Sequence, residues 1–202
     1  MLAPEQIYHI YNHANGNESL FRNDDNFIYF LEKYDEHLRL VANTYAYCLM
    51  PNHFHLLVKI KDEKSIIGGA FQKFGTFGKL SMQLFISKQF SNFFSSYTQS
   101  YNKVYNRKGS LFMPNFKKNL IENITYLKNV LNYIHMNPVL HGFVKAPFEW
   151  KYSSYNAYFS GKETKIPHQL VLEAIECSTG EFLKKHNLKD AEKYSTEMGL
   201  QF

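Results

Sequence analysis

The sequence predicts an α+β fold, in which a central antiparallel β-sheet has helices laid on one face and a helical tail follows. The main observation is the order of its patterns, because strand-like apolar runs and stretches of helical spacing follow as strand, helix, hairpin, helix, strand, helix. A Pro-Asn pair between two of the runs predicts a tight hairpin. Of the 202 residues, 45% are hydrophobic and 20% charged, which is enough for one domain with a core.

The first half of the chain has a clear signal for each element. Residues 7–13 (IYHIYNH) are β-branched and aromatic and precede the turn-like ANGN, which predicts a strand. Apolar residues recur at helical spacing over 24–41, behind the capping candidate Asn23, which predicts a helix. The apolar runs 44–50 and 53–60 are the two strands of the hairpin.

The second half predicts one long helix, a short strand pair and a further helix. An aromatic-rich stretch over 84–105 has the length of a long helix and ends at an Arg-Lys-Gly break. Two short strand-like runs follow, at 110–114 and 117–121. A helix is expected over 124–136, ending before Pro138 because a residue that precedes proline avoids the helical region.

The charge distribution indicates a polyanionic partner. The formal net charge is +5, and the 58 consecutive residues from 64 to 121 contain no Asp or Glu, although many aromatic residues are interleaved there. Bases of unpaired nucleic acid stack on aromatic rings while Lys and Arg neutralise phosphates, and a carboxylate would repel the strand. From this stretch we expect DNA contacts at Lys73, Lys79, Arg107, Lys108, Lys117 and Lys118.

Two histidines share one face of the second hairpin strand. His53 and His55 are two residues apart, so their side chains leave the sheet on the same side, about 7 Å apart. That spacing lets both rings converge on one divalent cation or one phosphate. His9 and His13 also share a face of their own predicted strand, but they lie far apart, and we expect structural or rim roles for them.

A tyrosine stands off the predicted core stripe of the helix 124–136. The stripe passes through Leu127, Leu131 and Ile134, and Tyr133 lies roughly 130° from its centre at 100° per residue. Asn137 follows one turn later on the same face. The pair can present a hydroxyl and an amide to something outside the helix, or it can be an exposed tyrosine followed by an ordinary helix-stop residue.

Together the two motifs resemble the paired signatures of the single-tyrosine HUH transposases. These motifs are MPNHFHLL at 50–57 and YIHMNPV at 133–139. Within that superfamily the chain is most similar to the REP-associated tyrosine transposases, whose domain is IS200-like. The resemblance covers about residues 6–160, and GSLF at 109–112 supports it.

The resemblance implies a specific site and chemistry. It makes His53 and His55 metal ligands, Asn137 the third ligand and Tyr133 the nucleophile, in a ferredoxin-like or RRM-like sandwich of sheet and helices. The expected protein is a DNA transposase with Mg²⁺ or Mn²⁺ as cofactor. It would cleave and rejoin single-stranded or hairpin DNA through a covalent 5′-phosphotyrosine, acting as a monomer or a homodimer.

We assign this transposase domain to residues 1–145 and a C-terminal extension to 146–202. The extension holds the single tryptophan and two short predicted helices, near 167–176 and 179–194. The sequence leaves the role of residues 161–202 open between covering the site, extending the DNA track and simply packing. Without a signal-like leader, a run of ~18 apolar residues or a cysteine framework, we expect a cytoplasmic protein with no membrane partner.

Two other functions fit parts of the pattern. The first is a non-catalytic protein that binds single-stranded nucleic acid, a degenerate relative that kept the basic aromatic surface. The second is a zinc-dependent phosphoesterase that uses the histidine pair with a water nucleophile. The first predicts binding that is indifferent to metal and to Tyr133, and the second predicts repeated turnover with no covalent adduct.

Overall fold

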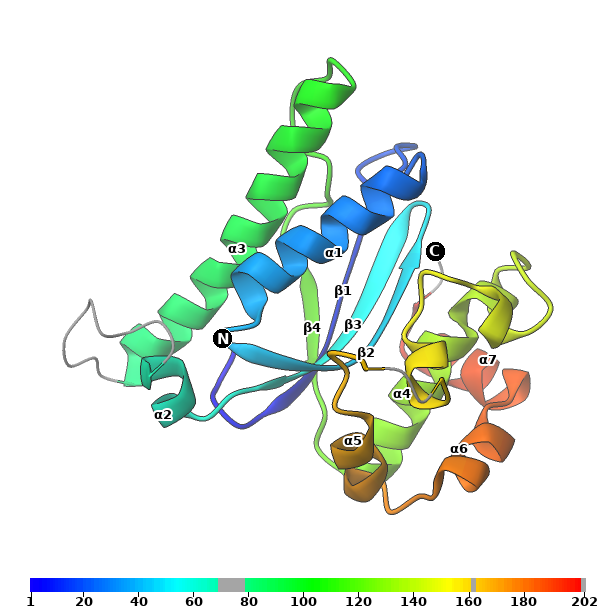
Figure 1. The fold of residues 1–202 in the computed structure, drawn as a ribbon. Coiled ribbons are helices and arrows are strands. Elements are labelled where there is room, and N and C mark those ends of the chain that lie inside the picture. The colour runs from blue at the N-terminus through cyan, green and yellow to red at the C-terminus, as the bar shows by residue number, and fades with distance from the viewer. Residues whose placement is uncertain (69–78, 161–162, 201–202) are drawn as a thin grey trace.

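A four-stranded antiparallel sheet forms the centre of the fold. The computed structural model describes residues 1–68, 79–160 and 163–200. The strands are ordered β2-β3-β1-β4 across the sheet, so β2 and β4 are its edges (Figure 1). Their bounds are Ile7–His13 for β1, Ala42–Met50 for β2, His53–Ile60 for β3 and Lys117–Leu120 for β4.

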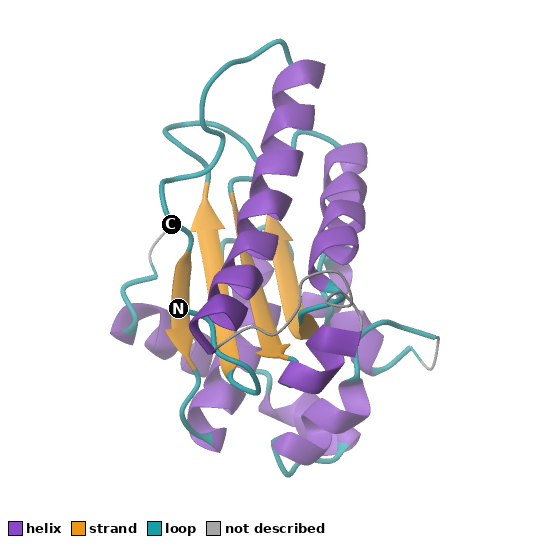
Figure 2. Ribbon diagram, turned by 90° about the vertical axis from the view of Figure 1, so that its left-hand side faces the viewer, coloured by secondary structure: helices purple, strands orange, loops and turns teal. Residues whose placement is uncertain are grey.

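Helices cover both faces of this sheet. Helices α1 (Asp24–Leu38) and α3 (Lys79–Val104) pack on one face, and α4 (Ile124–Leu140) and α7 (Leu188–Glu197) pack on the other. Figure 2 shows helices in front of and behind the strands. The short helices α2, α5 and α6 span Glu63–Ile66, His168–Ala174 and Thr179–Lys185. In the described residues no helix is both long and apolar enough to span a membrane.

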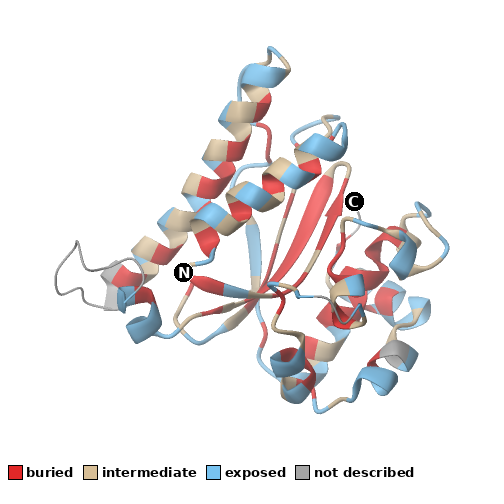
Figure 3. Cartoon of the chain, viewed as in Figure 1, coloured by how far each residue is buried: buried red, intermediate tan, exposed pale blue. Residues whose placement is uncertain are grey.

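The predicted α+β class and antiparallel sheet are confirmed, but the expectation of helices on one face only is wrong. Alternate residues of β3 enter two separate cores: Phe54 and Leu56 pack with α1 and α3, while Leu57 packs with α4. All three are fully buried. A strand that is buried on both sides needs a covering layer on both sides, and α4 with the C-terminal helices supplies the second (Figure 3).

Helix α4 also extends further than its sequence predicts. Asn123 caps it as the sequence indicates, by accepting a hydrogen bond from the amide of Tyr126 at 2.8 Å. The helix continues through Pro138 to Leu140. Proline removes one backbone hydrogen bond, and burial of α4 between the sheet and α7 outweighs that loss. Beyond the proline the amide of His141 still bonds the carbonyl of Asn137 at 3.1 Å.

Three smaller predictions also need correction. The run 110–114 forms only an isolated bridge between Phe112 and Ala14 instead of a strand. The helix expected over 24–41 ends at Leu38. The helix expected over 179–194 is broken into α6 and α7 at residues 186–187.

The chain after residue 145 is joined to the sheet by hydrogen bonds along the β2 edge. The amide of Leu49 bonds the carbonyl of Tyr152 at 3.0 Å, and the amide of Ser154 bonds the carbonyl of Tyr47 at 3.0 Å. The indole of Trp150 donates to the carbonyl of Leu49 at 3.0 Å. The extension therefore completes the β2 edge, which the first 145 residues leave unpaired.

Candidate active site

The two sequence motifs meet on the α4 side of the sheet. His53 Nε2 lies 2.9 Å from Asn137 Oδ1, and the Tyr133 hydroxyl lies 3.4 Å from His55 Nε2. The histidines come from β3 and the other two residues from successive turns of α4. The structure therefore brings together all four residues that the sequence singled out for catalysis and metal binding.

Tyr133 does not point outward from the protein. It has no exposed surface, and every residue of α4 from Val130 to Pro138 is buried. Tyr133 lies off the core stripe that the sequence predicts for its helix, but the far side of that helix is covered as well. One side of α4 packs on the sheet and another on the C-terminal helices, so a single-stripe pattern does not describe it.

A chain of hydrogen bonds sets the tautomer of His53. The Nδ1–H of His13 donates to the carbonyl of Ala14 at 2.7 Å, and its Nε2 accepts from Asn52 Nδ2 at 3.0 Å. The Asn52 oxygen therefore accepts the Nδ1–H of His53 at 2.8 Å. A neutral imidazole has one N–H, so Nε2 of His53 is left with its lone pair directed at Asn137.

A second chain orients His55. Its Nδ1 lies 3.0 Å from Nε2 of His9, and Nδ1 of His9 lies 3.4 Å from the Tyr194 hydroxyl. When His55 donates through Nδ1 to His9, its Nε2 faces the Tyr133 hydroxyl with a lone pair. Each of the two motif histidines is thus held at Nδ1 and presents Nε2 to the site, as metal-binding histidines commonly do.

The sequence does not predict the places of His9 and His13 beside the motif histidines. Both lie on β1, whose antiparallel register with β3 places His13 opposite His53 and His9 opposite Leu57. Cross-strand partners share a face, so both rings fall beside the motif histidines. The missing information was the β1–β3 pairing, because spacing within one strand does not show which strand lies next to it.

Burial controls the protonation of these groups. It lowers the pKa of His9 and of His53 to about 3, and it holds the pKa of His55 well below its usual value. It raises the pKa of the Tyr133 hydroxyl. At neutral pH the imidazoles are therefore neutral, with lone pairs available, and the phenol keeps its proton.

These residues fit a divalent cation by their donor chemistry. His53 Nε2 and Asn137 Oδ1 face each other at 2.9 Å, close to the ~3 Å expected between neighbouring ligands that are each ~2.1 Å from one ion. The amide nitrogen of Asn137 is buried with no hydrogen-bond partner among the described residues. Within those residues no group of three or more His, Cys, Asp or Glu is placed to hold a metal, so the site depends on this amide.

Helix α7 closes the site. The Tyr194 ring lies 5.1 Å from the Tyr133 ring, centroid to centroid, and is itself buried. Asn132 fixes the start of the helix, because its side-chain amide bonds both the carbonyl (3.1 Å) and the amide (3.0 Å) of Asn187. The C-terminal extension thus covers the candidate site, one of the three roles that the sequence left open.

The basic residues expected to contact DNA lie in different settings. Lys73 lies outside the described residues, Lys79 is the first residue of α3, and Lys108 is exposed. Arg107 pairs with Glu18 at 3.2 Å. Lys117 and Lys118 are exposed on the edge strand β4.

Comparison with known proteins gives one curated relative and one solved structure. The chain is 30% identical over 115 residues to a Haemophilus influenzae protein described as "Putative REP-associated tyrosine transposase". Over the matched residues the chain is therefore similar in sequence to this relative. The match covers 56% of this chain and spans 58% of the relative's length. No family model matches the chain.

The solved structure is described as "Structure of the REP associates tyrosine transposase bound to a REP hairpin". It matches with a TM-score of 0.51 at 17% identity, covering 79% of this chain and 82% of that one. It confirms the fold expected from the resemblance to REP-associated tyrosine transposases: an antiparallel sheet with packed helices.

Proposed function

We propose that this protein is a metal-dependent endonuclease and strand transferase for single-stranded DNA, of the transposase type. The observation that carries the proposal is the contact between the two motifs, in which Tyr133 lies beside His55, and His53 lies beside Asn137. The homology to a REP-associated tyrosine transposase supports this chemistry, and the hairpin in the related structure suggests hairpin DNA as the substrate.

In this mechanism the Tyr133 oxygen attacks a backbone phosphorus in line with the leaving 3′ oxygen. A tyrosyl oxygen–phosphorus bond forms and the bond from phosphorus to the 3′ oxygen breaks, which leaves a 5′-phosphotyrosine and a free 3′-hydroxyl. The adduct remains a phosphodiester, so a 3′-hydroxyl can reverse the step and rejoin strands without ATP.

His53, His55 and Asn137 would hold the cation through Nε2, Nε2 and Oδ1. When bound, the cation polarises a phosphate oxygen and stabilises negative charge at the reacting centre. The role of the protein's own residues is orientation. Hydrogen bonds with Asn52 and His9 fix the two imidazole rings, and the Tyr133 hydroxyl lies 3.4 Å from His55 Nε2.

The closed arrangement is a resting state. Tyr133 is fully buried, and burial raises the pKa of its hydroxyl while lowering that of His55, so proton loss is unfavourable there. A phosphate can reach the hydroxyl only if α7 moves, because Tyr194 packs on the Tyr133 ring. Displacement of α7 is therefore the first step of substrate binding.

The test is formation of a covalent protein–DNA adduct. The protein is incubated with end-labelled hairpin-bearing single-stranded DNA and Mn²⁺ or Mg²⁺, then run on a denaturing gel. We expect an adduct band that Tyr133→Phe and His53→Ala abolish. Tyr29→Phe is the matched control, because Tyr29 lies on α1, on the opposite face of the sheet, and its hydroxyl lies 2.8 Å from that of Ser100. A band that persists in Tyr133→Phe would remove the nucleophile.

The same experiment separates the two other functions that fit the sequence. A non-catalytic DNA-binding protein would shift the DNA on a native gel with or without metal, and would give no adduct. A phosphoesterase would release many cut strands per protein molecule with no adduct, in Tyr133→Phe as in the wild type.

A further inference from the structure

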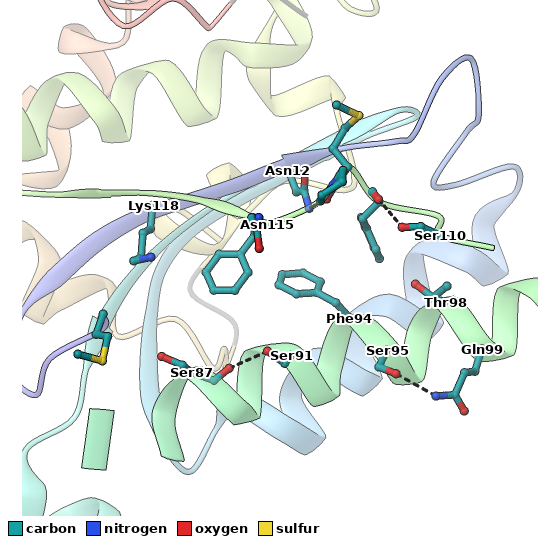
Figure 4. A pocket seen from close by; sticks show the side chains of 15 residues that line it. Asn12, Ser87, Ser91, Phe94, Ser95, Thr98, Gln99, Ser110, Asn115 and Lys118 are labelled. Atoms are coloured by element: carbon teal, nitrogen blue, oxygen red, sulfur yellow. Dashed lines mark hydrogen bonds between the residues drawn. The ribbon is translucent and has the colours of Figure 1, made fainter. Parts of the chain in front are cut away.

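A groove of about 560 Å³ lies on the face of the sheet opposite Tyr133. It opens between α3 and the segment 110–118, which leads into β4 (Figure 4). Its floor includes Phe94 and Phe112, which belong to the α1–α3 core. None of the described residues that line it is a carboxylate, in agreement with the acid-free stretch from 64 to 121. The chemistry proposed for Tyr133 leaves this groove unexplained.

One wall of the groove is a row of hydroxyl side chains on α3. This hydroxyl row consists of Ser87, Ser91, Ser95 and Thr98. Steps of three and four residues place all of them on one side of the helix, and Figure 4 shows them following its length. Ser91 donates to the carbonyl of Ser87 at 3.1 Å, and Ser95 accepts from Gln99 at 2.9 Å. Short hydroxyl side chains contact phosphate and sugar oxygens in DNA complexes, and a row of them suits a repeating backbone.

The opposite wall pairs an aromatic ring with a cation. Phe116 is half-buried, and its ring packs against Phe90 and Phe94 at centroid distances of 5.7 and 5.3 Å. The ammonium group of Lys118 lies 5.8 Å from the centre of the Phe116 ring. A supported ring beside a lysine is the combination that binds a stacked base and its phosphate.

The wall is held in place before any ligand arrives. Asn12 donates to the carbonyl of Met113 at 3.1 Å, and the amide of Met113 bonds the carbonyl of His13 at 2.9 Å. Asn115 has a φ of 59°, a left-handed conformation that asparagine tolerates better than most residues. A preformed groove loses less conformational entropy on binding.

The edge strand β4 connects this groove to the candidate active site. Lys118 is paired with Ile10, whose side chain lies on the groove side, and Lys117 is paired with Tyr11, which lies beside His55. Neighbouring residues of a strand point to opposite faces, so β4 presents one cation to each face. Adjacent exposed lysines at a sheet edge also disfavour pairing with a second copy of the chain.

We propose that this groove binds an unpaired segment of the substrate DNA. Its phosphates lie along the hydroxyl row, one base stacks on Phe116, and the strand passes around the β4 edge toward Tyr133. The choice of DNA over another polyanion rests on the proposed function. The groove itself rests on the absence of carboxylates, the row of hydroxyls and the Phe116–Lys118 pair.

The test compares two DNA probes in the Tyr133→Phe protein without metal, where no cleavage interferes. One probe is a blunt hairpin and the other is the same hairpin with an unpaired tail. The groove variants are Lys118→Glu and the double variant Ser91→Asp/Ser95→Asp, and the control is Lys103→Glu. Each lowers the formal charge by two, and Lys103 is exposed near the end of α3, outside the groove. A third groove variant, Phe116→Leu, leaves the charge unchanged, removes the ring and keeps an apolar side chain.

We expect each groove variant to weaken binding of the tailed hairpin roughly tenfold or more, and binding of the blunt hairpin less than about twofold. Lys103→Glu should weaken both probes alike, through net charge alone. Equal losses for both probes in the groove variants would overturn the proposal. If the aspartates unfold the protein, as judged by its thermal transition, Ser91→Ala/Ser95→Ala gives the same comparison.

The outcome is separable from that of the proposed nuclease. If the wild type forms no adduct but the groove variants lose tail-dependent binding, the groove proposal stands and the nuclease proposal is contradicted. If the wild type forms the adduct and the groove variants bind the tail normally, the nuclease proposal stands and the groove proposal is overturned.

Discussion

The two faces of strand β3 are equally buried but chemically opposite. Phe54 and Leu56 on one face are fully buried, and so is His55 on the other, with His53 only 2% exposed. The phenylalanine face is a packed aromatic cluster that needs no polar partners. The histidine face is a hydrogen-bonded network, in which Nδ1 of His53 bonds Asn52 and Nδ1 of His55 bonds His9.

The difference shows how one strand can serve stability and chemistry together. Burying apolar side chains stabilises the fold, whereas burying polar ones costs free energy unless each is hydrogen-bonded. The α1–α3 face therefore stabilises a sheet whose other face carries neutral histidines away from water. Four substitutions or conditions test this division, in descending order of expected effect.

The largest effect is expected from Phe54→Ala on the apolar face. The ring packs against Phe30 and Phe94 at 5.4 and 5.5 Å, so its removal leaves a cavity and should cost about 3–5 kcal/mol of unfolding free energy. His55→Ala on the other face should cost less stability and abolish the adduct. Urea unfolding of both variants is the measurement, and a greater loss in His55→Ala would contradict the division of roles.

Acid should lower the free energy of unfolding through the buried histidines on the α4 side of the sheet. His186, between α6 and α7, bonds His135 of α4 at 3.0 Å, and burial lowers its pKa to about 4. Its folded pKa lies below the unfolded value near 6.5, so the stabilisation is complete above pH 6.5 and is lost as pH falls toward 4. His186→Gln should make the decline of unfolding free energy with falling pH shallower by up to about 1.4 kcal/mol per pH unit. An unchanged slope in that variant would exclude His186 as a source.

Asn52→Ala should weaken metal binding at the proposed site without changing a proposed ligand. It removes the acceptor that fixes the Nδ1–H of His53, so Mn²⁺ affinity should fall about 10- to 100-fold. Isothermal titration with Mn²⁺ measures this, with the exposed Asn43→Ala as control. Unaltered affinity in Asn52→Ala would mean that the hydrogen-bond chain does not orient the ligand.

The smallest effect is expected from freeing α7. Asn132→Ala removes two hydrogen bonds to the backbone of Asn187, which together contribute about 1–2 kcal/mol to docking of that helix. The open population should rise, and the initial rate of adduct formation with it, by about fivefold or more. A slower rate would indicate that α7 helps to bind substrate instead of covering the site.

The sequence predicted the placement of the motif residues better than that of their surroundings. Strand alternation placed His53 and His55 on one face, and helical spacing placed Tyr133 and Asn137 one turn apart, because both depend only on local geometry. The roles of these residues stay predictions. The contributions of His9, His13 and Tyr194 depend on strand pairing and on the docking of a distant helix, which local patterns do not encode. Burial of Tyr133 escaped prediction for the same reason.

The single tryptophan lies at the seam between the extension and the sheet. Trp150 donates to the carbonyl of Leu49 and lies 5.6 Å from Phe143, ring centre to ring centre. Its intrinsic fluorescence will therefore change when this seam opens and the indole becomes hydrated. Tryptophan fluorescence can therefore follow the rate at which the extension separates from the sheet, with no dye or engineered label.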